Sequence, residues 1–423
     1  MTKLVQVGMV EHVVNLAWAM ERTRLALAGS DGRLRVAIVP EIGRGEVARA
    51  ICLAEAHHNE AGDAAFTVLF HHWDNTMPKW DMAHHAGVCG VIDADVCIHP
   101  VPRAMLLNAL RERFDVVYDA APIPTGTYCA RPEGKAGMSR RVMLRLQADA
   151  DQRLKPWMNV YAGHPLEAYG LATCGMPWWA IMSEATGLDI KPTALACAAP
   201  VECAPWPDPA DIPPGNTLDG LKENSGSDNW ERAEVKGVKN YVLLHAGTGP
   251  GCPNKLPTVA WFETVVAALD KADFRSVQVG TAGETHIKGT INRLGLRLPL
   301  VNRLGQYAVA LIDSEGFLNY QAYGLGLPAA VAFGPTPTSL FALPGNLNLI
   351  WLDAEGNAAC PVGTCFWGGA GCAPKMQWAE RCWLGEHNTT GACMNVPHAD
   401  WAAERIVAFV QQCKASKKQR GAA

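Results

Sequence analysis

Two loops in the second half of the chain carry residues whose chemistry suits an anionic ligand. The first, LLHAGTGPGCPNKLP (residues 243–257), follows a short apolar run and combines small residues with Thr248 and Lys255. Exposed backbone N–H groups, a hydroxyl and an ammonium group can all bind phosphate oxygens. Taken alone, the loop is better explained as a surface turn with an exposed lysine than as a diphosphate site. A diphosphate site therefore needs a second anion-binding element.

The second loop, LIDSEGF (residues 311–317), supplies such an element. A strand is expected to end at Asp313, and a helix is expected to begin at residues 315–317. The N-terminus of a helix offers unpaired backbone N–H groups and the positive end of the helix dipole. We therefore predict an anion seat that faces the first loop and consists of Ser314, Glu315, Gly316 and Phe317.

Five cysteines lie within 34 residues near the end of the chain, from Cys360 to Cys393. The first twenty residues fit one face of a helix and lack a signal-peptide cleavage site. No stretch reaches the ~18 uninterrupted apolar residues of a membrane span. A soluble, cytoplasmic protein is therefore expected, in which thiols stay reduced. Clustered cysteines then favour a metal site over disulfides, with buried reduced cysteines as a further alternative.

Length and composition limit the class of protein. A chain of 423 residues favours two domains, and 49% apolar with 18% charged residues is typical of a globular protein. The formal net charge of −4 argues against a large phosphate-binding face. Nucleic acid is therefore not expected as the main partner.

Apolar strand patterns alternate with helical patterns in both halves of the chain, which predicts parallel sheets covered on both faces. In the first half, strands are expected at 35–40, 66–72, 90–100 and 114–122, with helices at 41–60 and 102–114. In the second half, strands are expected at 240–247, 275–280, 307–313, 328–334 and 347–353, with helices at 258–272, 317–326 and 399–415. The segment between the halves is rich in Pro, Gly, Asp and Asn, which predicts a linker.

Taken in order, the motifs of the second half resemble glycosyltransferase family nine, the heptosyltransferases. The matching residues are Lys255, Asp313-Ser314-Glu315-Gly316, Leu325-Gly326-Leu327-Pro328 and Phe333-Gly334-Pro335-Thr336. The resemblance is specific over about residues 240–396 and thin before them. This chain differs from the family pattern by Asn319-Tyr320 in place of a histidine, by Glu315 inserted before Gly316, and by Leu256 in place of an aromatic residue.

The resemblance implies an α/β protein of the GT-B fold, with two Rossmann-like domains facing a central cleft and a C-terminal cysteine-rich metal finger. The expected parts are an acceptor domain (1–204), a linker (205–238), a nucleotide-sugar domain (239–358), the finger (359–396), and a C-terminal helix with a basic tail (397–423). In two-domain α/β proteins, ligands bind beyond the carboxyl ends of the strands.

The resemblance also implies roles for single residues. Thr248 and Lys255 would hold the donor diphosphate, and Glu284 would meet the nucleoside ribose. Glycosyl transfer needs a base for the acceptor hydroxyl, and Asp119, at a strand end, and Glu46, in the first glycine loop, are the candidates. Either carboxylate could instead cap a turn. The prolines that follow Asp119 are expected to end the sheet ladder there.

Autotransporter heptosyltransferases of this family carry a similar cysteine pattern. The matching residues are Cys360, Cys365, Cys382 and Cys393, with Cys372 as a fifth candidate. Four thiolates spaced C-x4-C-x16-C-x10-C can close a tetrahedral zinc or iron site. Such a site has no open coordination position, so a structural role is expected, and no redox cofactor is implied.

The resemblance thus implies a glycosyltransferase that moves a sugar from an ADP-heptose-like donor by inverting displacement. The acceptor, a protein or a glycan among the candidates, is not identified by any motif, and homo-oligomerisation is left open. The alternative is a catalytically silent GT-B scaffold that assembles or binds carbohydrate. Adjacent histidine pairs, such as His57-His58, point to different faces of an element and are not expected to chelate one ion.

Overall fold

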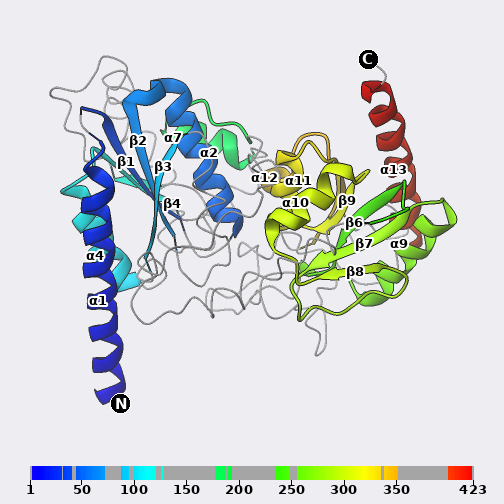
Figure 1. The fold of residues 1–423 in the computed structure, drawn as a ribbon, viewed down its shortest axis with the longest axis horizontal. Helices are drawn as coiled ribbons and strands as arrows, with labels where there is room; N and C mark the ends of the chain where they lie inside the picture. Colours follow the sequence, from blue (N-terminus) through cyan, green and yellow to red (C-terminus); the bar gives the residue numbers. More distant parts are fainter. Residues whose placement is uncertain are drawn as a thin grey trace. The chain divides into compact units, whose positions relative to one another are not determined.

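The computed structural model describes most of both halves of the chain. The described residues are 2–30, 32–40, 44–71, 87–94, 100–120, 125–127, 177–186, 188–192, 235–247, 255–334, 338–350 and 399–421. They belong to two compact α/β units (Figure 1). The first unit contains the described residues between 2 and 127 and from 178 to 192, and the second contains residue 177 and those from 235 to 421. None of the described helices combines the length and apolar composition needed to cross a bilayer.

The sheet of the first unit has the strand order β3-β2-β1-β4-β5. Its strands are β1 (Leu34–Pro40), β2 (Ala65–His71), β3 (Val88–Asp93), β4 (Val116–Ala120) and β5 (Thr125–Thr127). The first four are parallel. The expected end of the ladder after Asp119 is wrong, because β5 returns antiparallel to β4 and places Thr125 opposite Asp119. Proline removes its own N–H donor, but Thr125, Gly126 and Thr127, which follow the prolines, keep theirs.

Helices cover this sheet because its strands are apolar on both faces. They are α1 (Thr2–Leu27), α2 (Arg44–Ala61), α4 (Pro100–Arg111) and α7 (Trp178–Thr186), with a 3-10 turn, η1 (Gly62–Ala64). Leu106 and Leu110 of α4 and Ala19 of α1 pack on the face that carries Ala37 and Val39. Helix α2 contacts β1 and β2.

The second unit contains a six-stranded, fully parallel sheet with the order β11-β10-β9-β6-β7-β8. Its strands are β6 (Tyr241–His245), β7 (Arg275–Gly280), β8 (Ile291–Leu294), β9 (Leu311–Ser314), β10 (Ala329–Phe333) and β11 (Leu347–Ile350). From β6 the chain builds outward through β7 and β8, and then returns to the other side of β6 with β9. The boundary between β6 and β9 is therefore the topological switch point, where parallel α/β sheets bind ligands.

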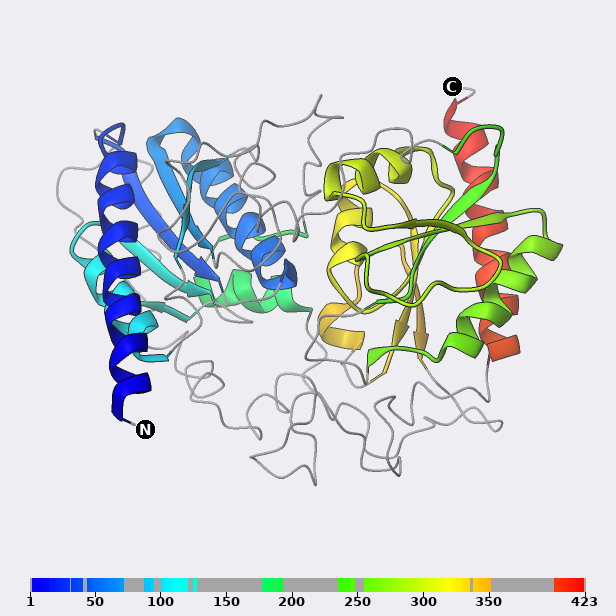
Figure 2. The same cartoon turned by 60° about the horizontal axis from the view of Figure 1, so that its bottom comes forward.

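Two layers of helices enclose this sheet. They are α9 (Val259–Lys271), α10 (Leu298–Tyr307), α11 (Phe317–Gly324), α12 (Thr338–Phe341) and α13 (Ala399–Gly421). Helices α9 and α13 lie side by side, as the green and red helices of Figure 2 show. Together they bury Trp261, Ile406 and Val410 against Val242 and Leu244 of β6.

Candidate functional site

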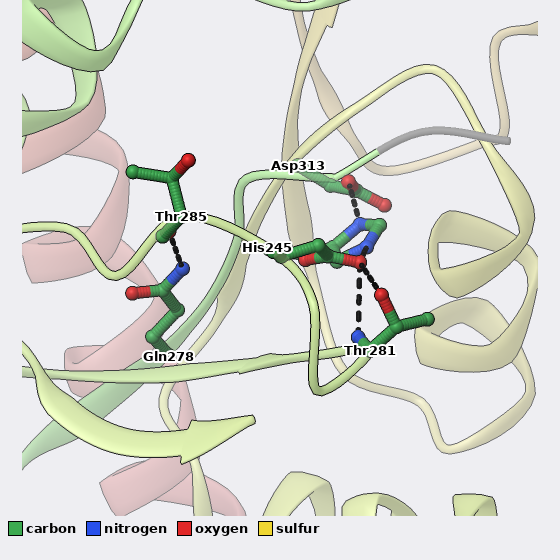
Figure 3. Close-up of polar contacts among 6 residues, drawn as sticks. His245, Gln278, Thr281, Thr285 and Asp313 are labelled. Carbon is green, nitrogen blue, oxygen red and sulfur yellow. Dashed lines mark hydrogen bonds and ion pairs between the residues drawn. The ribbon is translucent and has the colours of Figure 1, made fainter. Parts of the chain in front are cut away.

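His245 and Asp313 meet at the switch point of the second sheet. His245 ends β6, and Asp313 lies one step beyond the paired residues Leu244 and Ile312 on β9. The carboxyl ends of these two strands therefore place the side chains together. The Nδ1 atom of His245 is 2.8 Å from Oδ1 of Asp313, whose side chain is 1% exposed (Figure 3).

Glu284 reaches the opposite side of the same imidazole. It belongs to the loop after β7, and its Oε1 lies 3.6 Å from Nε2 of His245. The same oxygen accepts hydrogen bonds from the backbone N–H of Thr281, at 2.9 Å, and from the Thr281 hydroxyl, at 3.1 Å. His245 therefore lies between two carboxylates that come from separate segments of the chain.

Gln278 holds the loop that carries Glu284. Its side chain is fully buried on β7. The Nε2 atom donates to the carbonyl of Thr285 at 2.8 Å (Figure 3), and Oε1 accepts from the backbone N–H of Ile287 at 2.7 Å and from the Thr290 hydroxyl at 3.2 Å. One side chain thus fastens three points of the loop to the sheet.

Two glycines make room for the Glu284 carboxylate. A Cβ atom at Gly247, after β6, or at Gly280, at the end of β7, would overlap that carboxylate. Gly280 also has a φ of 148°, which side chains rarely adopt. In contrast, Gly283, in the same loop as Glu284, has open space around it. The sequence therefore needs glycine at 247 and 280 for the close approach of a functional group.

The electrostatics of the cluster follow from burial and mutual contact. Burial alone would lower the pKa of His245, but Asp313 and Glu284 outweigh it and raise that pKa to about 10. The imidazole is therefore protonated at neutral pH, and Nδ1–H donates to Asp313. Burial raises the pKa of Asp313, with a smaller push from Glu315, while His245 opposes the rise. Burial also acts to raise the pKa of Glu284, but His245 and Thr281 together bring it below its usual value.

Two carboxylate oxygens of this cluster are buried and have no hydrogen-bond partner within the described part of the chain. They are Oδ2 of Asp313 and Oε2 of Glu284. A buried acceptor without a donor costs free energy, of the order of 1–3 kcal/mol, unless a ligand or water supplies one. Both atoms could accept hydrogen bonds from the hydroxyl groups of a bound molecule.

Lys255 and Glu315 form a second charged pair. The Nζ atom of Lys255 lies 2.6 Å from Oε2 of Glu315, and the two side chains are 14% and 8% exposed. The expectation of a surface lysine is therefore wrong, since α9 and the sheet hold Lys255 close to the loop before α11. Gly316 is the N-cap of α11, and the first turn of that helix has no acidic residue.

The predicted donor residues divide into four groups. Lys255 and Glu315 are brought together by the structure, and Glu315 acts on the Asp313 carboxyl as described above. Ser314 is buried, and Gly316 with Phe317 begins α11, as predicted. Glu284 contacts His245 and not the lysine. Thr248 lies outside the described residues.

The side chains of the predicted catalytic and metal-ligating residues lie outside the described part of the chain. Asp119 lies near the carboxyl end of β4 beside Val39 of β1, and Glu46 lies in the first turns of α2, but the side chains of both carboxylates fall outside the described part. All five clustered cysteines also fall outside it. Within the described ranges, no group of three or more His, Cys, Asp or Glu residues is arranged to hold a metal ion.

Sequence reasoning missed His245, although a signal was present. A histidine at the last position of an apolar strand, directly before a glycine loop, is a polar residue at the edge where ligands bind. A different histidine, His57 of α2, is fully buried, and its Nε2 is 2.8 Å from the Tyr118 hydroxyl. Burial lowers the pKa of His57 to about 4, so it is neutral. Its neighbour His58 is half-buried on another face of the helix.

Comparison with known proteins finds likeness only among solved structures. No family model matches the chain, and no curated protein matches it. ADP-heptose lipopolysaccharide heptosyltransferase II of E. coli is 14% identical, covers 77% of this chain and 92% of its own, and superposes with a TM-score of 0.43. A glycosyltransferase family 9 protein of Veillonella parvula is 11% identical, with coverage of 90% and 97% and a TM-score of 0.43. The iron-containing dodecameric glycosyltransferase TibC of enterotoxigenic E. coli is 15% identical, with coverage of 42% and 48% and a TM-score of 0.33.

Proposed function

We propose that this chain is a glycosyltransferase of the GT-B class that uses a nucleotide-diphosphate sugar, ADP-heptose-like, as donor. The observation that carries the proposal is the convergence of His245, Glu284, Asp313 and the Lys255–Glu315 pair at the carboxyl ends of β6 and β9. Cations for a diphosphate and buried acceptors for sugar hydroxyls are thereby combined at the edge where parallel sheets bind ligands.

The donor is proposed to bind the second unit. Lys255 and Thr248 would hold the diphosphate with the first turn of α11, whose dipole favours negative charge. Glu284 would accept hydrogen bonds from the ribose through the oxygen that has no donor among the described residues. Asp313 supports the same ligand indirectly, because it keeps His245 protonated and in place.

The acceptor and the catalytic base are proposed to come from the first unit. Asp119 is our candidate for the base that takes the proton of the acceptor hydroxyl as the nucleotide leaves, with Glu46 as the second candidate. Asp119 is the last but one residue of β4, and Glu46 lies in α2, which follows the carboxyl end of the neighbouring parallel strand β1. Attack on the face opposite the leaving nucleotide would invert the anomeric configuration of the sugar.

The cysteine-rich segment is proposed to hold a structural metal ion. Cys360, Cys365, Cys382 and Cys393 would supply four thiolate ligands, a donor set that suits zinc or iron. With every coordination position filled by the protein, the ion would stabilise the glycine-rich segment and take no part in sugar transfer.

The first test is a panel of ADP-, UDP- and GDP-sugars in a thermal-shift measurement. A ligand that binds only the folded protein at a hundred times its Kd stabilises it by about 2.7 kcal/mol. Stabilisation by one nucleotide class would support the donor site, and stabilisation by none would leave the scaffold alternative.

The second test is transfer itself. A labelled form of the donor selected by the panel is incubated with the protein and a cell lysate, and label on a protein or glycan identifies the acceptor class. The anomeric configuration of the product, read by NMR, tests the inverting mechanism. A retained configuration would contradict it.

A further inference from the structure

The ammonium group of Lys255, which the proposed donor would need for its diphosphate, is already paired with the carboxylate of Glu315. The two charged atoms are 2.6 Å apart, a distance typical of a strong charge-assisted hydrogen bond. Both side chains are largely shielded from water, with exposures of 14% and 8%. Screening by solvent is weak at such a site, so the pair is held more firmly than a surface ion pair.

The charge of the described site is unfavourable for a diphosphate while this pair persists. The cluster contains two cationic side chains, His245 and Lys255, and three anionic ones, Glu284, Asp313 and Glu315. His245 is paired with two carboxylates and Lys255 with one, so each of these two cations already has an internal anion.

We propose that Glu315 is a specificity-determining residue, an internal anion that occupies the place of a ligand phosphate beside Lys255. The inference rests on the proposed function insofar as it takes the ligand to be a nucleoside diphosphate. Binding exchanges the carboxylate of Glu315 for a phosphate group at the same ammonium group. Only ligands that carry a strongly charged phosphate at this point can make the exchange.

The sequence around Glu315 makes such an exchange feasible. Gly316 follows it directly, with an extended φ of −179°, and a Cβ atom there would meet only the Ser314 carbonyl oxygen, at 3.7 Å, so the entry to α11 is uncrowded. The backbone N–H of Glu315 donates to the carbonyl of Ala332 on β10, at 3.0 Å, so the main chain stays anchored to the sheet. In the proposed exchange, the carboxylate leaves Lys255 by side-chain rotation while the main chain keeps this hydrogen bond.

The cost of the exchange appears as reduced affinity. A ligand that binds only the fraction of molecules with a competent site has an apparent Kd raised by the inverse of that fraction. If Lys255 is paired with Glu315 in roughly 90–99% of molecules, apparent affinity for a diphosphate falls roughly 10- to 100-fold. A neutral nucleoside does not use the ammonium group and carries no such penalty.

The test measures pyrophosphate, ADP and adenosine binding by calorimetry for the wild-type protein and the Glu315→Gln variant. Glutamine keeps the shape of the side chain and removes its charge. We expect pyrophosphate and ADP to bind about tenfold more tightly or better to the variant, and adenosine to bind both proteins equally. Glu404→Gln, on the exposed side of α13 in the same unit, is the matched control for the change in charge and should leave all three affinities unchanged.

A double-mutant cycle isolates the contact. In a Lys255→Gln background, Glu315→Gln should bring no gain in pyrophosphate affinity, because there is no ammonium group left for the carboxylate and the phosphate to compete for. Circular dichroism and thermal melting establish that each variant is folded. Should Glu315→Gln fail to fold, Glu315→Asp shortens the side chain while keeping its charge, and it should still tighten pyrophosphate binding severalfold.

Equal pyrophosphate and ADP affinities in folded wild-type, Glu315→Gln and Glu315→Asp proteins would overturn the inference while leaving the proposed donor site in place. A gain that persists without Lys255 would also overturn it, since the effect would then be a general change of charge. Tighter pyrophosphate binding by the variant, with no affinity for any nucleotide sugar, would support the internal anion and count against the glycosyltransferase proposal.

Discussion

His245, the last residue of β6, and Asp313, the last but one of the neighbouring strand β9, are 68 residues apart in the chain, and their side chains meet at 2.8 Å. The Asp313 carboxylate, with help from Glu284, keeps the imidazole charged although it is largely buried. The pair therefore sets both the geometry and the charge of the candidate site.

Stability should depend on pH through His245. Its folded-state pKa of about 10 exceeds the usual 6.5, so its contribution is complete below pH 6.5 and is lost as pH rises toward 10. The loss is at most about 1.4 kcal/mol per pH unit.

Urea unfolding at pH 7, 8, 9 and 10 should show this slope in the wild-type protein. The slope should be absent in His245→Gln, which should also be about 3 kcal/mol less stable at pH 7, because two buried carboxylates lose their counter-charge. Parallel curves for the two proteins would contradict the assignment.

The glycines beside Glu284 offer a matched pair of substitutions. Gly247→Ala should cost about 1–3 kcal/mol of stability, because its methyl group overlaps the Glu284 carboxylate and displaces it from His245. Gly283→Ala, in the same loop as Glu284 but in open space, should change stability by less than about 0.5 kcal/mol. Thermal melting of both variants decides the point. Equal melting temperatures would mean that the loop adapts and that the close approach is not required.

Asp119 can be tested by removing its basicity and keeping its shape. Asp119→Asn should lower the transfer rate by about 10²–10⁴, which is the range for loss of a general base. Donor affinity should hold, because the donor is proposed to bind the other unit. Asp63→Asn, at an exposed turn, is the control. Near-normal turnover would move the role to Glu46, and joint loss of turnover and donor affinity would indicate a structural role.

The cysteine-rich segment predicts that the protein binds a metal ion. Purified protein should contain about one equivalent of zinc or iron by elemental analysis, since a four-thiolate site binds a single ion. Cys382→Ser should lose the metal and become insoluble or strongly destabilised. Cys89→Ser, at an exposed and unbridged thiol of β3, should retain it. Stoichiometric disulfides in a metal-free protein would contradict the prediction.

Much of the fold could be predicted because most elements carry an unambiguous period. The strand predicted for the run RSVQVG has the same first and last residues as β7. The helix predicted for residues 258–272 differs from α9 by one residue at each end. The sequence prediction missed β8, whose residues INRL are half polar, and α10, whose interior Gly305 is unfavourable in a helix. It also missed β5, a three-residue edge strand that only its partner β4 defines.

The candidate site was less accessible to prediction for a physical reason. Lys255 and Glu315 were each singled out as ligand residues, but their mutual contact joins positions 60 residues apart and depends on the order of the strands. The roles of Gly247 and Gly280 likewise follow from where the loop of Glu284 passes, which Gln278 determines. Such contacts between distant segments leave no periodic trace in the sequence.

The pairing of β6 with β9 has a consequence during synthesis. A growing chain completes β6, α9, β7 and α10 before β9 emerges, and until then the carboxyl end of β6 lacks one neighbour. Domains generally fold as units as they leave the ribosome, and contacts between distant segments form late. His245 therefore gains the Asp313 carboxylate, the closer of its two counter-charges, only after residue 313 has been made. A truncated product released earlier would expose an unpaired strand edge and would have no affinity for the donor.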